Sequence, residues 1–248
     1  MLISVKADGA EALRSPMKLN VMRYIDNDRR LWDKWHTKHS LTSAEQIAFE
    51  CDKTENGYHV TGAVAARCRM PFLTYEIDYS VCKNVLTVEV AYELGGHDNL
   101  TEFPRVGFEF AVDKKFGSFD YVGFGPYESY VDKHVACEYG YYSSTAEQNY
   151  DRGYARPQEA GSHYASRYLK LDGLFQMTAK DKFSFSVNPF TTEQLYKSFH
   201  DFELPENDFV NVCIDLAMRG IGSYSCGPAL DSEYEIPRKG KNTFKFVF

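Results

Sequence analysis

The sequence lacks the features that mark membrane, nucleic-acid-binding and zinc-binding proteins. No apolar run approaches the ~20 residues that cross a bilayer, and residues 1–5 are too short a run for a signal peptide. No run of Lys and Arg stands out in a chain of net charge −7, which argues against nucleic acid as a partner. The six cysteines are scattered without a CxxC pair. We therefore expect free thiols, no metal site and a cytoplasmic location.

Motifs for several common kinds of catalysis are also missing. The chain has no Gly-x-Ser-x-Gly elbow, no glycine-rich phosphate loop and no succession of βα repeats. What it has instead is an abundance of aromatic residues, 18 Tyr and 18 Phe. Aromatic residues are enriched in strands, so this composition favours an all-β protein.

Apolar and polar residues alternate with period two in several segments, which predicts strands with one buried face. Residues 75–80 and 85 onward read as two strands joined around residues 82–84. We expect the last alternating segment to complete a sheet at the C-terminus. The alternating segments are 85–94, 105–112, 182–187, 211–218 and 243–248.

Helices are expected to be few and short. Residues 29–35 and 192–200 have apolar side chains four positions apart, and Thr192 is the expected N-cap of the second segment. The chain shows no internal repeat and no low-complexity linker. The sequence therefore predicts one domain over residues 1–248, with many antiparallel strands in two packed sheets.

Three motifs follow one another along the second half of the chain. They are Tyr-Val-Gly-Phe-Gly-Pro-Tyr-Glu-Ser-Tyr-Val-Asp at 121–132, Arg-Pro-Gln-Glu-Ala-Gly-Ser-His at 156–163 and Gly-Ile-Gly-Ser-Tyr-Ser-Cys-Gly-Pro at 220–228. In this order and spacing they resemble the C-terminal, or small-chain, domain of large bacterial β-galactosidases of glycoside hydrolase family 2. The resemblance implies an antiparallel β-super-sandwich of the galactose mutarotase-like kind.

The resemblance extends to the start of the chain. Residues 3–13 look like the opening hairpin of that domain, with Asp8 and Gly9 as its turn. Further on, Arg23 and the Asp-Asn-Asp of residues 26–28 match a family stretch, but Met22 replaces the usual Trp and the connecting loop is one residue shorter. We interpret this loop as structural, because Asp and Asn satisfy turn backbone groups.

The first of the three motifs is expected to be mainly a support. Its two glycines allow a bend, and its proline fixes the direction of the chain that follows. Glu128 is then held where it can accept hydrogen bonds from backbone N–H groups or from a sugar hydroxyl. The matching residues are Gly123, Gly125, Pro126, Glu128, Tyr130 and Asp132.

The second motif leaves two interpretations open. Its clustered donors and acceptors suit a polar cleft that binds sugar hydroxyls. Alternatively, Glu159 pairs with Arg156 or Arg167 in a buried network that holds the loops together. The candidate cleft residues are Arg156, Gln158, Glu159, His163 and Arg167, with Ala160 in place of the usual Asn.

The third motif provides further support positions at Gly220, Gly222 and Pro228. In many relatives a Trp of this loop forms part of the sugar site on the catalytic barrel. Cys226 stands at that position here and offers no stacking face, while Tyr224 is a candidate substitute.

The resemblance also implies what the chain leaves to other parts of the enzyme. Retaining glycosidases use two carboxyl groups about 5.5 Å apart, and in this family both are glutamates on a (β/α)8 barrel. We therefore assign no catalytic residue and no cofactor here, although Mg²⁺ and Na⁺ are used by family enzymes. The expected partners are a catalytic barrel domain of the same or another chain, a β-galactoside sugar and further subunits of an oligomer. The start at Met1, just before the hairpin, suggests an expressed piece of a longer protein.

Two other functions remain as alternatives. Aldose 1-epimerases share the super-sandwich, so the chain is alternatively a free-standing epimerase with His163 and Glu159 as its acid and base. The second alternative is that the chain is a non-catalytic carbohydrate-binding module.

Overall fold

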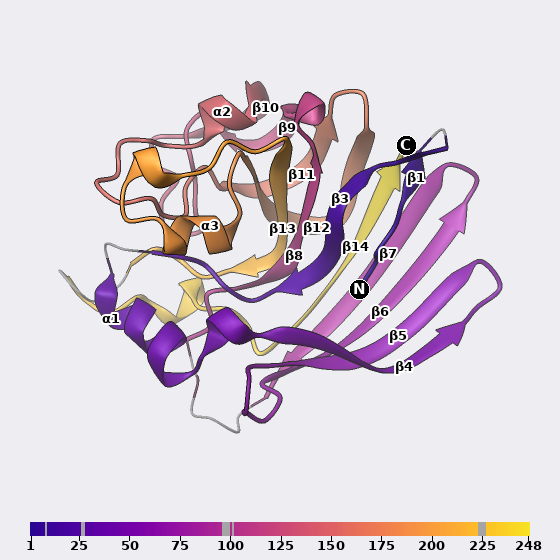
Figure 1. The fold of residues 1–248 in the computed structure, drawn as a ribbon, viewed down its shortest axis with the longest axis horizontal. Coiled ribbons are helices and arrows are strands. Elements are labelled where there is room, and N and C mark those ends of the chain that lie inside the picture. Colours follow the sequence, from indigo (N-terminus) through magenta and orange to yellow (C-terminus); the bar gives the residue numbers. More distant parts are fainter. Residues whose placement is uncertain (8, 26–27, 96–99, 101, 223–226) are drawn as a thin grey trace.

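The computed structural model describes residues 1–7, 9–25, 28–95, 100, 102–222 and 227–248. Antiparallel strands dominate this part of the chain (Figure 1). The strands are β1 (Lys6–Ala7), β2 (Ala10–Glu11), β3 (Leu13–Asn20), β4 (Glu45–Lys53), β5 (Gly57–Ala65), β6 (Leu73–Cys82), β7 (Val85–Leu94), β8 (Arg105–Asp113), β9 (Ser118–Gly125), β10 (Glu138–Thr145), β11 (His163–Leu171), β12 (Phe175–Asn188), β13 (Phe209–Met218) and β14 (Lys239–Val247).

Helices are short and lie in the connections. They are α1 (Arg29–Asp33), α2 (Ala146–Asn149) and α3 (Thr192–Lys197), a π-helical turn at Lys34–Lys38, and 3-10 turns at Leu41–Ser43, Lys114–Phe116, Asp201–Glu203 and Ser232–Tyr234. The N-cap of α3 is Thr191, not the expected Thr192. The Thr191 hydroxyl accepts from the backbone N–H of Gln194, whose side chain returns to the backbone of Thr191. This reciprocal pair satisfies two free N–H groups of the first turn.

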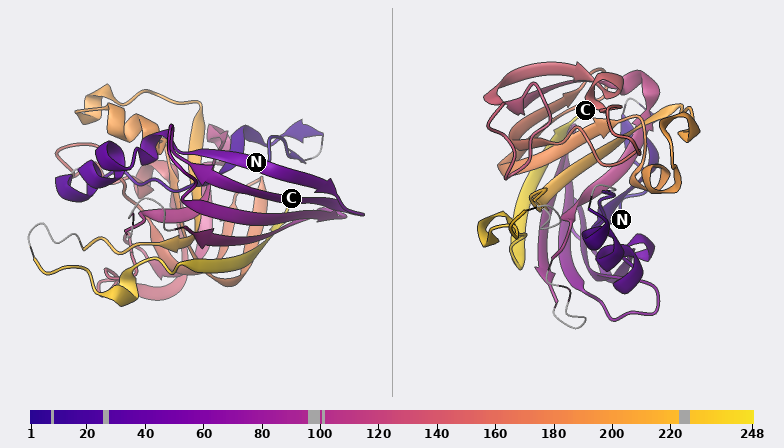
Figure 2. Two further views of the ribbon diagram at one scale, coloured as in Figure 1. Left: turned by 90° about the horizontal axis from the view of Figure 1, so that it is seen from below. Right: turned by 90° about the vertical axis from the view of Figure 1, so that its left-hand side faces the viewer.

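The strands pair in the order β10-β9-β11-β12-β14-β7-β6-β5-β4, and β13, β8 and β3 branch from β12. The long strand β12 belongs to both layers of the sandwich. Its first half, to Ala179, pairs with β14, and its second half, from Ser184, pairs with β13. The predicted class is therefore confirmed, but the two layers are joined through one strand instead of forming separate sheets (Figure 2).

The layers meet through aromatic side chains. Phe108 on β8 contacts Phe244 on β14 edge-to-face, with ring centroids 6.4 Å apart. Phe185 on β12 is fully buried and lies 5.3 Å from Tyr121 and 5.8 Å from Phe119 on β9. Edge-to-face pairs add to the hydrophobic stabilisation of a core.

The predicted alternation is seen most clearly in β6 and β7, where alternate residues are buried. The turn between them falls at Lys83 and Asn84, inside the expected region. Strand β8 departs from the pattern, since all its residues except the last are buried. The reason is that other strands and loops cover both of its faces, so its polar residues also need partners inside the protein.

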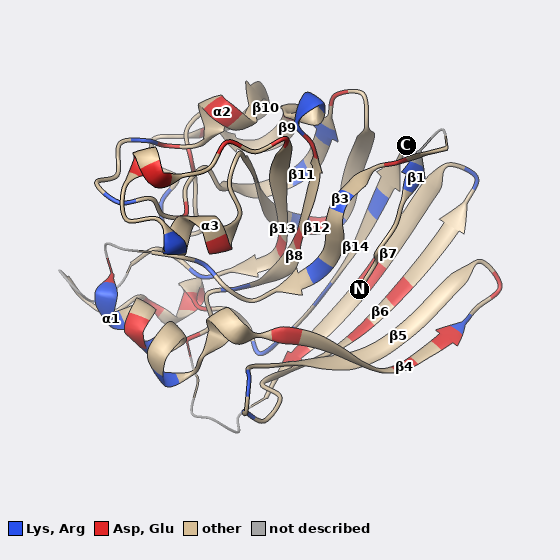
Figure 3. Ribbon diagram, in the orientation of Figure 1, with Lys and Arg blue, Asp and Glu red and all other residues tan. Residues whose placement is uncertain are grey.

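Several other expectations can be compared with the structure. The opening hairpin forms with Gly9 at φ 80°, while Asp8 lies outside the described residues. The five described cysteines are free thiols, as predicted. No helix of the described part is long and apolar enough to cross a membrane. Lys and Arg lie interspersed with Asp and Glu along the ribbon (Figure 3).

We predict that Phe185→Ala lowers the free energy of unfolding by about 3–5 kcal/mol, because it leaves a cavity among buried rings. Phe202→Ala is the matched control, since Phe202 is 83% exposed and its loss should cost less than about 0.5 kcal/mol. Urea denaturation of both variants measures the difference. Equal effects would show that Phe185 contributes no more to stability than an exposed ring.

Candidate functional site

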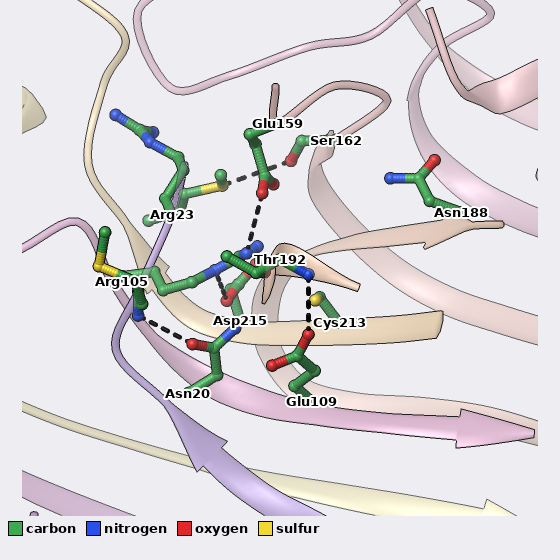
Figure 4. A network of polar contacts seen from close by, with 12 residues as sticks. Asn20, Arg23, Arg105, Glu109, Glu159, Ser162, Asn188, Thr192, Cys213 and Asp215 are labelled. Atoms are coloured by element: carbon green, nitrogen blue, oxygen red, sulfur yellow. Dashed lines mark hydrogen bonds and ion pairs between the residues drawn. The ribbon is translucent and has the colours of Figure 1, made fainter. Parts of the chain in front are cut away.

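A buried ion-pair network lies beneath the loops at one end of the sandwich. Arg105, at the start of β8, is fully buried, and its Nε and Nη2 donate to the two carboxylate oxygens of Asp215 on β13 at 2.8 and 2.6 Å. Its Nη1 donates to Glu159 at 3.2 Å (Figure 4). Burial raises the pKa of both carboxyl groups, and the charge of Arg105 opposes that rise. The network ties β8 and β13 to the loop that carries the second motif.

The predicted pairing of Glu159 with Arg156 or Arg167 is wrong, because its salt bridge is with Arg105. Arg167 is exposed on β11, and the Arg156 guanidinium lies 3.8 Å from the centroid of the Phe199 ring. The buried network that the sequence suggested therefore exists, but its cation comes from a strand about fifty positions earlier in the chain.

Two more buried arginines hold the start of the third motif. Arg23 donates to the backbone carbonyls of Arg219 at 2.7 Å and Gly220 at 3.2 Å. Arg219 makes a two-point pair with Glu235 at 2.9 and 2.8 Å and also donates to the carbonyl of Gly222 at 3.0 Å. Paired N–H donors from a planar guanidinium fix position as well as charge.

The first and third motifs contact each other directly. Asp132 accepts from the backbone N–H groups of Ile221 at 2.9 Å and Gly222 at 2.8 Å. A Cβ atom on Gly220 would lie 2.7 Å from the Asp132 carboxyl carbon, so this close approach needs glycine. The loop that begins at residue 220 is thus anchored from three directions.

Glu128 joins the first motif to the second. One carboxylate oxygen accepts from Lys133 Nζ at 2.6 Å and the Tyr154 hydroxyl at 3.3 Å. The other accepts from the Gly161 N–H at 3.0 Å and the Tyr130 hydroxyl at 3.3 Å. Burial, followed by the nearby charge of Glu128, raises the pKa of Tyr130, so this phenol stays a donor. Four donors fill the acceptor capacity of the carboxylate.

His163 is enclosed at the start of β11. Its Nε2 lies 2.8 Å from the Asn149 side-chain oxygen, and its ring centroid is 4.2 Å from that of Tyr121. Burial lowers its pKa to about 4, because a charged imidazole loses its hydration there. The ring is therefore neutral at physiological pH and holds α2 against β11.

The five residues of the candidate cleft do not share one surface. Gln158, Glu159 and His163 are buried, Arg156 is half-buried and Arg167 is exposed. Tyr224 and Cys226, the other two candidates, lie outside the described residues. A sugar-binding role for these positions stays a prediction.

Sequence reasoning missed Arg105, Asp215, Arg219 and Glu235. A signal was present, since Asp215 interrupts the apolar run 212–216 of a predicted strand. A charge inside a buried strand requires a partner of opposite sign. The sequence does not say which of its many basic residues supplies that partner.

The described residues contain no group of three His, Cys, Asp or Glu side chains that could hold a metal ion. The arrangement thus defines a sandwich domain in which buried arginines and their partners anchor loops at one end. The sequence profile of the family described as beta galactosidase small chain matches residues 1–248. The chain belongs to the β-galactosidase small-chain family.

Curated relatives agree with this assignment. A β-galactosidase of Actinobacillus pleuropneumoniae is 35% identical over 236 residues, which are 94% of this chain and 23% of the relative. One from Streptococcus thermophilus is 32% identical over 238 residues, which are 89% of this chain and 22% of the relative. The chain therefore spans less than a quarter of the length of these relatives.

Solved structures that are similar to this chain have low sequence identity to it. A galactose mutarotase-like protein from Lactobacillus casei is 14% identical, with a TM-score of 0.45 over 97% of this chain and 90% of that one.

We predict that Arg105→Met destabilises the protein by about 3–5 kcal/mol at pH 7, because it leaves two carboxylates buried without a cation. A buried carboxyl whose pKa is higher in the folded than in the unfolded state lowers the free energy of unfolding at pH values above its folded pKa. This loss of stability decreases as the pH falls and the carboxyl becomes protonated. The deficit should therefore shrink on acidification in urea-unfolding measurements. Arg14→Met is the control, since its pair with Asp113 is 49% and 34% exposed and should contribute less than about 1 kcal/mol.

We also predict that NMR titration finds His163 neutral down to pH values near 4, whereas His59 titrates above its ordinary pKa through its hydrogen bond to Asp78. Between pH ~6.5 and 4 the unfolded chain binds a proton at residue 163 that the folded chain does not. His163 therefore makes the protein less stable as the pH falls through this window. His163→Gln should flatten that dependence, and an unchanged slope would contradict the burial of the ring.

Proposed function

We propose that this chain is the small-chain domain of a β-galactosidase of glycoside hydrolase family 2, and that it supports a catalytic barrel located outside the chain. The complete enzyme would hydrolyse terminal β-D-galactosides with retention, in the cytoplasm and as an oligomer. The observation that carries the proposal is the family match over residues 1–248, combined with a share of 22–23% in much longer β-galactosidases.

The carboxylates of the site support a non-catalytic role for the chain. A glycosidase needs an acid and a nucleophile that both reach the scissile bond. Asp215 and Glu159 are 1% and 7% exposed and share the cation of Arg105. Glu128 accepts four hydrogen bonds from its surroundings. None of the three is available as an acid or a nucleophile.

The anchored end of the sandwich is the surface that we assign to the barrel. Figure 1 shows α1, α3 and the chain that follows β13 at this end, and the views of Figure 2 agree. Apolar side chains project from it into solvent: Phe199 is 59% exposed, Phe202 83% and Ile221 37%. Large exposed apolar groups on a rigid base are typical of protein interfaces. A partner at this end would also place the loop of the third motif at the edge of the sugar site.

The metal ions of the complete enzyme belong to the same proposal. As the family resemblance implies, we assign any Mg²⁺ or Na⁺ of the enzyme to the barrel side. The chain would then contribute shape and assembly and leave ion binding to its partner.

The epimerase alternative is not supported by the residues proposed for it. A general acid or base must reach the proton that it transfers. His163 is 1% exposed and bonded to Asn149, and Glu159 is bonded to Arg105. Neither side chain has access to a sugar from solvent.

We predict that the 248-residue chain alone does not hydrolyse a nitrophenyl β-galactoside, and that activity appears when the complementary β-galactosidase polypeptide is added. Phe202→Asp should weaken this association about tenfold or more, because it buries a charge in an apolar interface. Titration of activity against the concentration of the chain gives the affinity.

Tyr58→Asp is the matched control for that experiment. Tyr58 is 49% exposed and lies in the β4–β5 hairpin, at the opposite end of the sheet (Figure 1). Its replacement should leave the affinity unchanged. Hydrolysis by the chain alone at the rate of the mixture would show that the catalytic carboxylates lie in this chain after all.

A further inference from the structure

A pocket whose lining includes none of Arg105, Asp215 and Glu159 lies beside Glu128. It sits between the loop that follows β9, the helix α2 and the segment after α2, and has a volume of about 430 Å³. We call it the Glu128 pocket. Small-molecule sites occupy roughly 300–1,000 Å³, so the pocket is large enough for a monosaccharide or a disaccharide end.

Hydrogen bonds to neighbouring residues hold the walls of the Glu128 pocket in place. Glu128 is fixed by its four donors, as described above. The side-chain nitrogen of Asn149 donates to the Gly161 carbonyl at 2.8 Å. The side-chain oxygen of Asn149 lies 2.8 Å from Nε2 of His163. The sulfur atom of Cys137 is 3.5 Å from the carbonyl oxygen of Tyr127. A pocket with fixed walls loses little freedom when it binds a ligand.

The charges of the lining favour a neutral ligand. Lys133 and Arg152 supply two positive charges, and Glu128 and Asp151 supply two negative ones, so the formal sum is zero. A phosphate ester or a nucleotide would need an excess of cations. An entirely apolar ligand would leave the four charged groups of the lining unused.

The free groups at the pocket match hydroxyl-rich molecules. The Lys133 ammonium carries three donors and is 49% exposed, with one donor given to Glu128. Gln148 and Asp151 are exposed at the rim and add an amide and a carboxylate. Tyr127, which is 68% exposed, lines the pocket and carries a ring of the kind that stacks on the apolar side of a pyranose.

We propose that the Glu128 pocket binds a neutral saccharide, with Tyr127 stacking on a sugar ring and Lys133, Gln148 and Asp151 contacting its hydroxyls. The site lies entirely within this chain and requires neither the barrel nor its catalytic residues. Binding at the pocket and complementation of activity can therefore succeed or fail independently of each other.

Saturation-transfer NMR and calorimetry on the 248-residue chain test the proposal, with methyl β-galactoside, methyl β-glucoside and galactose 6-phosphate as probes. We expect binding of at least one neutral glycoside and weaker binding of the phosphate ester. Tyr127→Ala should reduce the affinity about tenfold, since it removes the stacking face. Ala136→Trp should abolish binding by filling the pocket, because Ala136 is an exposed lining residue.

Tyr141→Ala is the matched control, since Tyr141 is 62% exposed on β10 and does not line the pocket. Circular dichroism and amide NMR spectra verify that each variant is folded. Three results would each overturn the proposal: no binding of either neutral glycoside, tighter binding of galactose 6-phosphate, or equal affinities for Tyr127→Ala, Ala136→Trp and the unmodified chain.

Discussion

The guanidinium of Arg105 is charged in a place that water does not reach, and the surrounding chain is arranged to compensate that charge. Asp215 on the neighbouring strand and Glu159 on a loop meet it from two sides. A buried ion pair adds little net stability compared with apolar residues of the same shape, but breaking it is costly. The network ties the loop at residue 159 to β8 and β13.

That constraint extends to the loops around it. The backbone N–H of Glu159 donates to the Tyr24 carbonyl at 2.8 Å, which links the second motif to the segment containing Arg23. Arg23 in turn binds the carbonyls of residues 219 and 220, and Asp132 binds the N–H groups of residues 221 and 222. Hydrogen bonds thus connect four segments that are far apart in the sequence.

The two polar regions of the molecule differ in the way they use charge. In the Arg105 network, the charged groups are buried and paired with one another. In the Glu128 pocket, buried contacts fix the walls while Lys133, Gln148 and Tyr127 keep exposed surface. The motif 121–132 contributes to both regions, through Asp132 on one side and Glu128 on the other.

The sequence by itself determined the all-β class, the positions of β6, β7, β8, β13 and β14 and the turn between β6 and β7, because period-two alternation is a local property of each segment. The motif resemblance also pointed to the correct family. Only the tertiary structure decided the rest. That β12 serves both layers, that β8 is buried on both faces and that Glu159 pairs with Arg105 all depend on which segments meet in space. Local patterns cannot contain this information, because an ion pair between residues 54 positions apart is specified by the packing of the whole chain.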